Sequence, residues 1–223
     1  MNVLITGVGP HNHGAELMLI AILEQLRSRF DDARAAVFPY AGPFPWRAGY
    51  GLFQMFDPAA SGRLGFLRKR LMHRGYRERF GLLLPEEIDL VLDASGYAYG
   101  DAWKVEWVNA AADQLERLRA GGARIVLMPQ AFGPFRDRAI AHASSRVIDS
   151  ADLVFCRDAE SLEYVRSLCP KASGLCLAPD FTNLVQPRPS EFSVPRSPCV
   201  GIVPNETMRR QLARPAAERY LAD

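Results

Sequence analysis

The chain has 223 residues, which is enough for one full domain, or for one domain and part of a second. Hydrophobic residues make up 48% and charged residues 23%, an ordinary globular composition, and a net charge of +2 gives no argument for a nucleic-acid partner. The four cysteines show no C-x-x-C spacing, so we expect neither a zinc site nor a disulfide framework.

The first predicted unit is a strand, a glycine loop and a helix. Residues Asn2–Thr6 form an apolar run that predicts a buried strand, and apolar positions within residues 17–30 fall at helical spacing. Such a unit opens a doubly wound α/β sheet, and its loop lies where these folds bind ligands. The loop matches no nucleotide-binding fingerprint, because Gly7 and Gly9 are followed by Pro10 instead of a third glycine.

The next segment is predicted to be less regular. Residues 33–39 predict a second strand, and residues 40–65 form a long irregular stretch rich in glycine, proline and aromatic residues. A loop of that length is typical of a lid or a binding loop, or of an excursion with a small aromatic core.

Residues 66–80 predict a helix with one strongly basic face. The basic residues are Arg68, Lys69, Arg70, His73, Arg74, Arg77 and Arg79. This face is either a solvated surface opposite a core stripe, or a contact with anionic lipid head groups or an acidic substrate. The second alternative implies peripheral contact with a membrane.

Strands and helices alternate through the rest of the first 181 residues. Strands are predicted at residues 88–92, 124–128, Leu153–Cys156 and Leu175–Leu177. Helices are predicted at residues 102–120, 137–150 and 158–168, with Asp158 as an N-cap, Gly121 and Gly122 as a C-cap and residues 129–135 as a rigid turn. This alternation predicts a mostly parallel, doubly wound Rossmann-like sheet whose strand-end loops gather at one edge.

The composition changes after residue 181. Four prolines within residues 182–198 predict an interdomain linker, and residues 199–203 predict the first strand of another α/β unit. We therefore expect an N-terminal domain at residues 1–181 and the start of a C-terminal domain at residues 199–223, with the remainder of that domain missing.

The protein is expected in the cytoplasm. The N-terminus starts directly with the predicted strand, without the basic and apolar regions of a signal peptide. No apolar run reaches the ~18 residues that a membrane helix needs. If the basic helix binds lipid, the protein would lie at the inner face of the membrane.

The most polar strand-end loop spans residues 93–101. Asp93 or Asp101 could accept a hydroxyl proton or bind sugar hydroxyls, or each could instead cap neighbouring backbone N–H groups. Arg157, at another strand end, could bind a phosphate or carboxylate, or could pair with an acidic neighbour such as Asp180. These alternatives remain open from the residues alone.

The first loop carries two histidines. His11 and His13 are either proton shuttles or surface turn residues. Asn12 and Gly14 are interpreted as the turn, and Glu16 as an acid in the first helical turn that the helix dipole favours.

Five short motifs occur in the order in which one enzyme family has them. They are residues 12–16 (NHGAE), 89–96 (DLVLDASG), 129–134 (PQAFGP), 151–161 (ADLVFCRDAES) and 179–180 (PD). Together they resemble the polysaccharide pyruvyl transferase family over about residues 2–203. Two positions depart from the family's motifs: Ala15 stands where Asp is usual, and Ala94-Ser95 replaces a glycine-rich sequence. These departures leave room for a divergent member with another acceptor.

The resemblance implies two Rossmann-like domains arranged as in GT-B glycosyltransferases, with the active site in the cleft between them. The implied reaction transfers an enolpyruvyl-derived group from phosphoenolpyruvate, the donor substrate, to sugar hydroxyls of a free or lipid-linked polysaccharide precursor and forms a pyruvate ketal. It needs an acid, a base and cations, but no further cofactor. The family's donor-binding basic residues lie largely in the C-terminal domain, so this chain would be the acceptor-side half and inactive alone.

On this interpretation Asp93 and Asp101 are the candidate catalytic residues, either one serving as base. The candidate substrate-binding residues are Asn12, His13, Gly14, Glu16, Ser95, Gly96, Gln130, Gly133 and Arg157. Two other hypotheses stay open: a GT-B glycosyltransferase that uses a nucleotide sugar, and a non-catalytic binding module.

Overall fold

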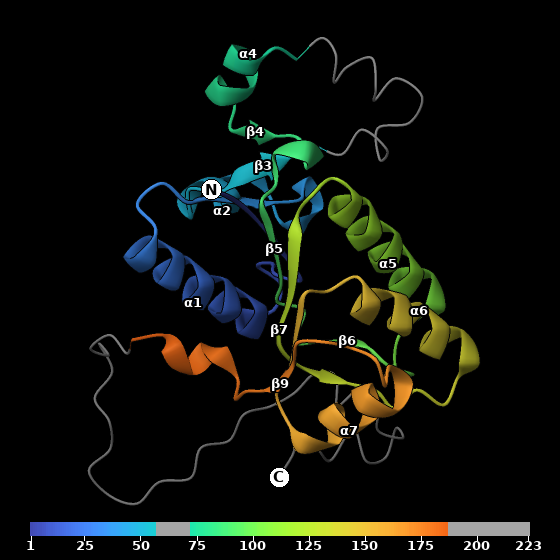
Figure 1. Ribbon diagram of the computed structural model, residues 1–223. Coiled ribbons are helices and arrows are strands. Elements are labelled where there is room, and N and C mark those ends of the chain that lie inside the picture. Colours follow the sequence, from blue (N-terminus) through green and yellow to red (C-terminus); the bar gives the residue numbers. More distant parts are fainter. Residues whose placement is uncertain (57–71, 187–223) are drawn as a thin grey trace, which may run out of the picture. The chain divides into compact units, whose positions relative to one another are not determined.

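The structure is a computed structural model that describes residues 1–56 and 72–186 (Figure 1). The chain divides into two compact units, Met1–Gln186 and Pro187–Asp223. The predicted linker from residue 187 onward and the predicted strand at residues 199–203 lie outside the described residues. The first linker residues belong to a short 3-10 helix, η4 (Phe181–Leu184).

The described strands form one nine-stranded, parallel sheet, which confirms the predicted α/β fold class. The strands are β1 (Asn2–Thr6), β2 (Arg34–Val37), β3 (Phe53–Met55), β4 (Leu82–Leu83), β5 (Leu90–Asp93), β6 (Tyr97–Tyr99), β7 (Arg124–Phe132), β8 (Leu153–Cys156) and β9 (Leu175–Leu177). Their order is β4-β3-β2-β1-β5-β7-β8-β9, with β6 paired to β7, and each neighbouring pair is parallel. The strand order reverses between β1 and β5, because β2 to β4 follow on one side of β1 and the later strands on the other. Doubly wound folds bind ligands at such a position.

Helices cover both faces of the sheet (Figure 1). They are α1 (His13–Arg29), α2 (Phe44–Gly49), α4 (Arg74–Arg79), α5 (Val105–Ala120), α6 (Arg138–Asp149) and α7 (Ala159–Leu168), with 3-10 turns η1 (Pro39–Ala41) and η3 (Pro85–Glu87). One buried cluster joins α1 and η4 to one face, and a larger cluster joins α5, α6 and α7 to the other. The sheet is therefore doubly wound, as predicted.

Local signals gave several element bounds correctly. β1, β8 and β9 have the predicted residues, and Asp158 caps α7 by accepting a hydrogen bond from the Ser161 backbone N–H. Gly121 is the C-cap of α5, and Gly122 follows it with φ +99°.

Two predictions near the sheet edge are wrong. Gly14 was interpreted as part of the turn, but it lies in the first turn of a helix that starts at His13, with Asn12 as its N-cap and Glu16 in its first turn as predicted. The predicted rigid turn at residues 129–135 is mostly strand, because β7 continues to Phe132 through a register shift between Leu127 and Gln130. Pro129 falls within that irregularity, the place where a strand tolerates a residue without an N–H.

The segments around the basic helix also differ from the prediction. The described part of the irregular stretch contains α2 and β3, and a further two-residue strand, β4, follows α4. Of the predicted helix at residues 66–80, residues 66–71 lie outside the described part. His73 is extended and caps α4 by accepting a hydrogen bond from the Tyr76 N–H, so the described helix begins at Arg74.

Candidate functional site

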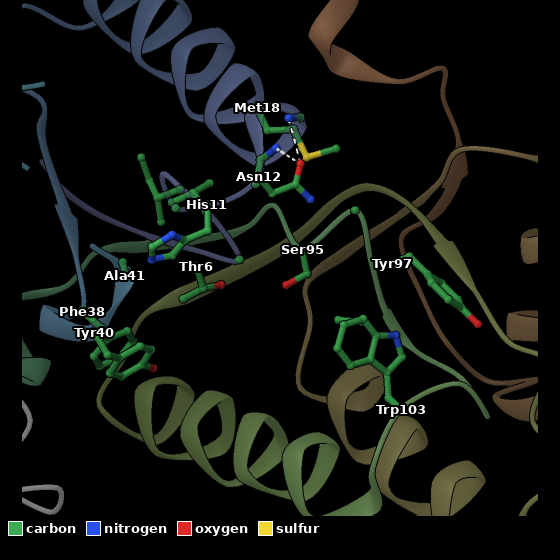
Figure 2. Close-up of a pocket in the computed structure, with 18 of the residues that line it drawn as sticks. Thr6, His11, Asn12, Met18, Phe38, Tyr40, Ala41, Ser95, Tyr97 and Trp103 are labelled. Atoms are coloured by element: carbon green, nitrogen blue, oxygen red, sulfur yellow. Dashed lines mark hydrogen bonds between the residues drawn. The ribbon is translucent and has the colours of Figure 1, made fainter. Parts of the chain in front are cut away.

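Loops at the carboxyl edge of the sheet enclose a cavity of about 620 Å³ (Figure 2). They follow β1, β2, β5 and β8, so the predicted gathering of strand-end loops is confirmed for these four. The cavity lining includes Thr6, Gly7, His11, Asn12, Gly14, Ala15, Phe38, Tyr40, Ser95, Gly96, Tyr97, Trp103 and Arg157. Its volume falls in the range of small-molecule sites.

Gly7 sets the distance between the first two loops. It has φ +76°, and a Cβ built on it would lie 2.4 Å from the backbone N and Cα of Ser95. Only glycine allows both the left-handed conformation and this approach. The close packing holds Ser95 against the end of β1, inside the cavity wall.

Asn12 acts as the cap of α1. Its Oδ1 accepts hydrogen bonds from the backbone N–H groups of Gly14 at 2.9 Å and Ala15 at 3.4 Å. An anion bound at this helix N-terminus would need the same donors. Asn12 and Gly14 line the cavity, but the N–H groups of Gly14 and Ala15 are engaged by Asn12 rather than presented to a phosphate.

Glu16 anchors α2 to α1. Its Oε1 accepts hydrogen bonds from Trp46 Nε1 at 2.7 Å and from the Tyr50 hydroxyl at 2.9 Å, and these bonds lower the pKa of Glu16. His13 Nδ1 lies 3.6 Å from the other carboxylate oxygen, with its side chain 97% exposed. Neither Glu16 nor His13 lines the cavity. A role of either residue in ligand binding stays a prediction.

Asp93 is buried, and both of its oxygens accept hydrogen bonds. The Ser95 N–H donates to Oδ1 at 2.9 Å, and the Tyr99 hydroxyl donates to Oδ2 at 2.5 Å. The Tyr99 side chain is itself fully buried, and its burial together with the Asp93 charge raises its pKa well above the ordinary value. Of the two roles that the sequence left open for Asp93, the hydrogen bonding favours the structural one.

Asp101 also holds backbone in place. Its two oxygens accept from the N–H groups of Arg136 at 2.9 Å and Asp137 at 3.2 Å, which fastens the loop before α5 to the segment after β7. Asp101 is absent from the cavity lining. A catalytic role for either aspartate stays a prediction, and the contacts of both are those of capping groups.

Gln130 and Gly133 do not line the cavity. Gln130 is fully buried in β7, and neither side-chain polar atom has a partner among the described residues. Gly133 has φ +72°, and its carbonyl accepts the Tyr97 hydroxyl at 3.1 Å. A Cβ at Gly133 would lie 2.7 Å from the Tyr164 ring, so glycine is required here for packing.

Arg157 reaches the cavity from the end of β8. Its Nη1 lies 3.8 Å from Asp180 Oδ2, and both side chains are about one-third exposed. At that distance and exposure the pair contributes little to stability. Of the two roles considered for Arg157, the pair with Asp180 is present, and binding of an anionic ligand stays a prediction with which this loose pair is compatible.

Several cavity residues were not among the predicted site residues, Thr6, Tyr40 and Trp103 among them. His11 also lines the cavity and had been left as a shuttle or a turn residue. Only position could have drawn attention to the first three: Thr6 ends a predicted strand, Tyr40 directly follows one, and Trp103 lies at the start of a predicted helix.

The basic helix is partly neutralised where the structure describes it. Arg74 pairs with Glu78 at 2.7 Å, and Arg77 pairs with Glu87. Membrane contact through this surface stays a prediction. Every helix within residues 1–56 and 72–186 is too short or too polar to span a bilayer. These same ranges contain no group of three acidic, histidine or cysteine side chains that could hold a metal.

Comparison with known proteins gives a matching family model and matches to solved structures. The model of the family described as "Polysaccharide pyruvyl transferase" matches residues 12–222. The chain is also similar to Anabaena Alr3699/HepE, solved in complex with UDP and glucose, with 17% sequence identity and a TM-score of 0.45. That match covers 80% of this chain and 44% of the other, so the chain spans less than half the length of that structure. A search of curated proteins gave no match.

Proposed function

The chain belongs to the polysaccharide pyruvyl transferase family, and on this premise we propose that it contributes the acceptor side of a pyruvyl transferase. The donor is phosphoenolpyruvate, and the acceptor is a sugar of a polysaccharide precursor. The family match over residues 12–222 is the observation that carries this proposal. The remainder of the active site, including most of the donor site, belongs to a longer two-domain protein of GT-B type.

The chemistry of the cavity walls supports a sugar as the ligand. The Phe38 and Tyr40 rings stack at 5.1 Å on one side, and Trp103 lies on the other (Figure 2). The side chains of Thr6 and Ser95 lie between them (Figure 2). A pyranose has apolar C–H faces and a rim of hydroxyls, so aromatic walls with hydroxyl groups between them suit it.

In the proposed reaction, the enol carbon of phosphoenolpyruvate is protonated and a sugar hydroxyl adds to C2. The phosphate then leaves, and a second hydroxyl of the sugar closes the ketal. Each hydroxyl must lose a proton. His11 is the imidazole among the described cavity residues, and we assign it the role of base in place of the hydrogen-bonded Asp93 and Asp101.

Arg157 is suited to the donor's negative charge. It lies at the cavity and pairs only loosely with Asp180, so it can form a bidentate contact with a carboxylate or phosphate. Its position beside the acceptor space would bring the donor's C2 toward the hydroxyls.

The test uses the full-length protein with phosphoenolpyruvate and surface glycans of the producing organism. Phosphate release and the methyl signal of the ketal in proton NMR report the reaction. His11→Gln should lower the rate by roughly 100-fold or more, as loss of a general base does. His142→Gln, on the exposed side of α6, is the matched control and should keep the wild-type rate. Consumption of a nucleotide sugar without ketal formation would establish the glycosyltransferase alternative and refute this proposal.

A further inference from the structure

The cavity continues along α5. A second space of about 210 Å³ shares six residues with the first: Thr6, Gly7, Tyr40, Ser95, Ala98 and Trp103. It adds side chains from the helix, among them Trp107, Ala111 and Gln114. The two spaces therefore adjoin each other and are together named the groove: the proposed acceptor site is in the first space, and the first three turns of α5 line the second.

A row of aromatic rings follows this groove. The ring centroids of Tyr97 and Trp103 are 6.4 Å apart, and those of Trp103 and Trp107 are 5.9 Å apart. Trp107 is 58% exposed, and Lys104 Nζ lies 5.7 Å from its ring. An exposed cation–π contact of this kind stabilises by only about 0.5–1 kcal/mol, so a ligand can displace the lysine. A large ring left exposed at the end of a groove is a candidate contact surface.

Polar groups without partners lie beside the rings. Trp103 Nε1 and Thr6 Oγ1 have almost no accessible surface and no hydrogen-bond partner among the described residues, and both side chains border both spaces. Leaving a buried polar group unsatisfied costs about 1–3 kcal/mol. At the helix side, Gln114 Nε2 and the Tyr40 hydroxyl are 3.4 Å apart, which puts further donors and acceptors on the groove.

We propose that the acceptor is an oligosaccharide of at least two sugar units, with the reacting sugar in the first space and its neighbour on the Trp103–Trp107 rings. This inference rests on the proposed function. The spacing of the rings suits consecutive pyranose units, each of which offers an apolar face to a ring and hydroxyls to Gln114 and Tyr40. The second space is lined by one charged residue, Asp93, whose oxygens are already bound, so charge does not drive recognition there.

The test compares glycans of different length. Surface polysaccharide of the producing organism is partially hydrolysed and separated into monosaccharides, disaccharides and tetrasaccharides, which are titrated calorimetrically into the full-length protein. Trp107→Ala should weaken tetrasaccharide binding by roughly threefold to tenfold, the loss of one stacking contact, and leave monosaccharide binding unchanged. Phe44→Ala is the control, because Phe44 is 72% exposed and borders neither space.

Three results would overturn the inference: equal binding of tetrasaccharide by Trp107→Ala and wild type, equal loss for all lengths, or no binding of any glycan. Its outcome is separable from that of the proposed function. If ketal forms at equal rates on monosaccharide and tetrasaccharide, and Trp107→Ala does not change these rates, the proposed transferase function is supported and the oligosaccharide groove is refuted. If longer glycans bind more tightly, Trp107→Ala abolishes this difference and no ketal forms, the groove is supported and the transferase function is refuted.

Discussion

Asp93→Asn separates a structural aspartate from a catalytic one. In the wild type, Oδ1 accepts from the Ser95 N–H at 2.9 Å and Oδ2 accepts from the Tyr99 hydroxyl at 2.5 Å, all within a buried site. An asparagine keeps one oxygen for Ser95 but turns an NH₂ toward Tyr99. The hydroxyl of Tyr99 then loses its acceptor, and the strongest bond of the loop is gone.

The magnitude follows from the charge of the acceptor. A hydrogen bond to a charged group contributes about 1.5–3 kcal/mol, so Asp93→Asn should lower the unfolding free energy by about that amount. With a urea m-value of about 2 kcal/mol/M, the midpoint should fall by roughly 1 M. Unfolding of the full-length protein in urea, followed by tryptophan fluorescence, measures it. Asp31→Asn, at an exposed position, should shift the unfolding free energy by less than about 0.5 kcal/mol.

Tyr99→Phe completes the comparison as a double-mutant cycle. Because Asp93 and Tyr99 share one bond, the two substitutions together should cost less than the sum of their separate effects, by about 1 kcal/mol or more. The structural role of Asp93 is refuted if Asp93→Asn unfolds at the wild-type urea concentration while ketal formation is lost. That pair of results would make Asp93 the base and its hydrogen bonds incidental.

Three further substitutions test the surroundings of the cavity. Gly7→Ala should destabilise by about 3 kcal/mol or more in thermal unfolding, since a Cβ would meet the Ser95 backbone at 2.4 Å; a loss below 1 kcal/mol would contradict that packing. Glu16→Gln should lower stability by about 1 kcal/mol at pH 7, because it weakens the bond from Trp46. The pKa of Glu16 is lowered in the folded state, so its contribution is full above the ordinary value of 4.5 and disappears as pH falls through the lowered one; urea midpoints of the two proteins should converge there. Gln130→Met should be neutral or stabilising by up to about 1 kcal/mol in the same urea assay, since it removes two polar atoms that lack partners, whereas a large loss would reveal a bound water or ligand.

The fold could be predicted where the signals are local. The hydrophobic pattern alternates between strand and helix periodicity, and this pattern and the caps at Asp158 and Gly121 can each be recognised within a few residues. Together they predicted a parallel sheet. β3 and β4 have three and two residues, too few for any period to show. β7 was cut short because a proline usually ends a strand, and the sequence does not reveal that Pro129 lies at a register shift.

The site could be predicted only to the level of the sheet edge. The positions of the loops were predicted correctly from residue types and strand ends, but the direction of each side chain could not be predicted from them. Glu16 finds its partners at Trp46 and Tyr50, some thirty residues away, and such partners appear only after the chain folds. A carboxylate that accepts hydrogen bonds from nearby backbone or ring N–H groups has fewer lone pairs left to bind a ligand.

The side chain at position 15 bears on which group in the cavity could act as a base. Ala15 lines the cavity, and it stands where the motif of the family usually carries Asp. A carboxylate at position 15 would therefore border the acceptor space, whereas Asp93 and Asp101 are committed to Tyr99 and to backbone N–H groups. With that carboxylate absent, the cavity keeps an imidazole, at His11, beside aromatic walls and a guanidinium. Under the proposed function, we therefore assign proton removal from the sugar to His11 and sugar binding to stacking more than to charge.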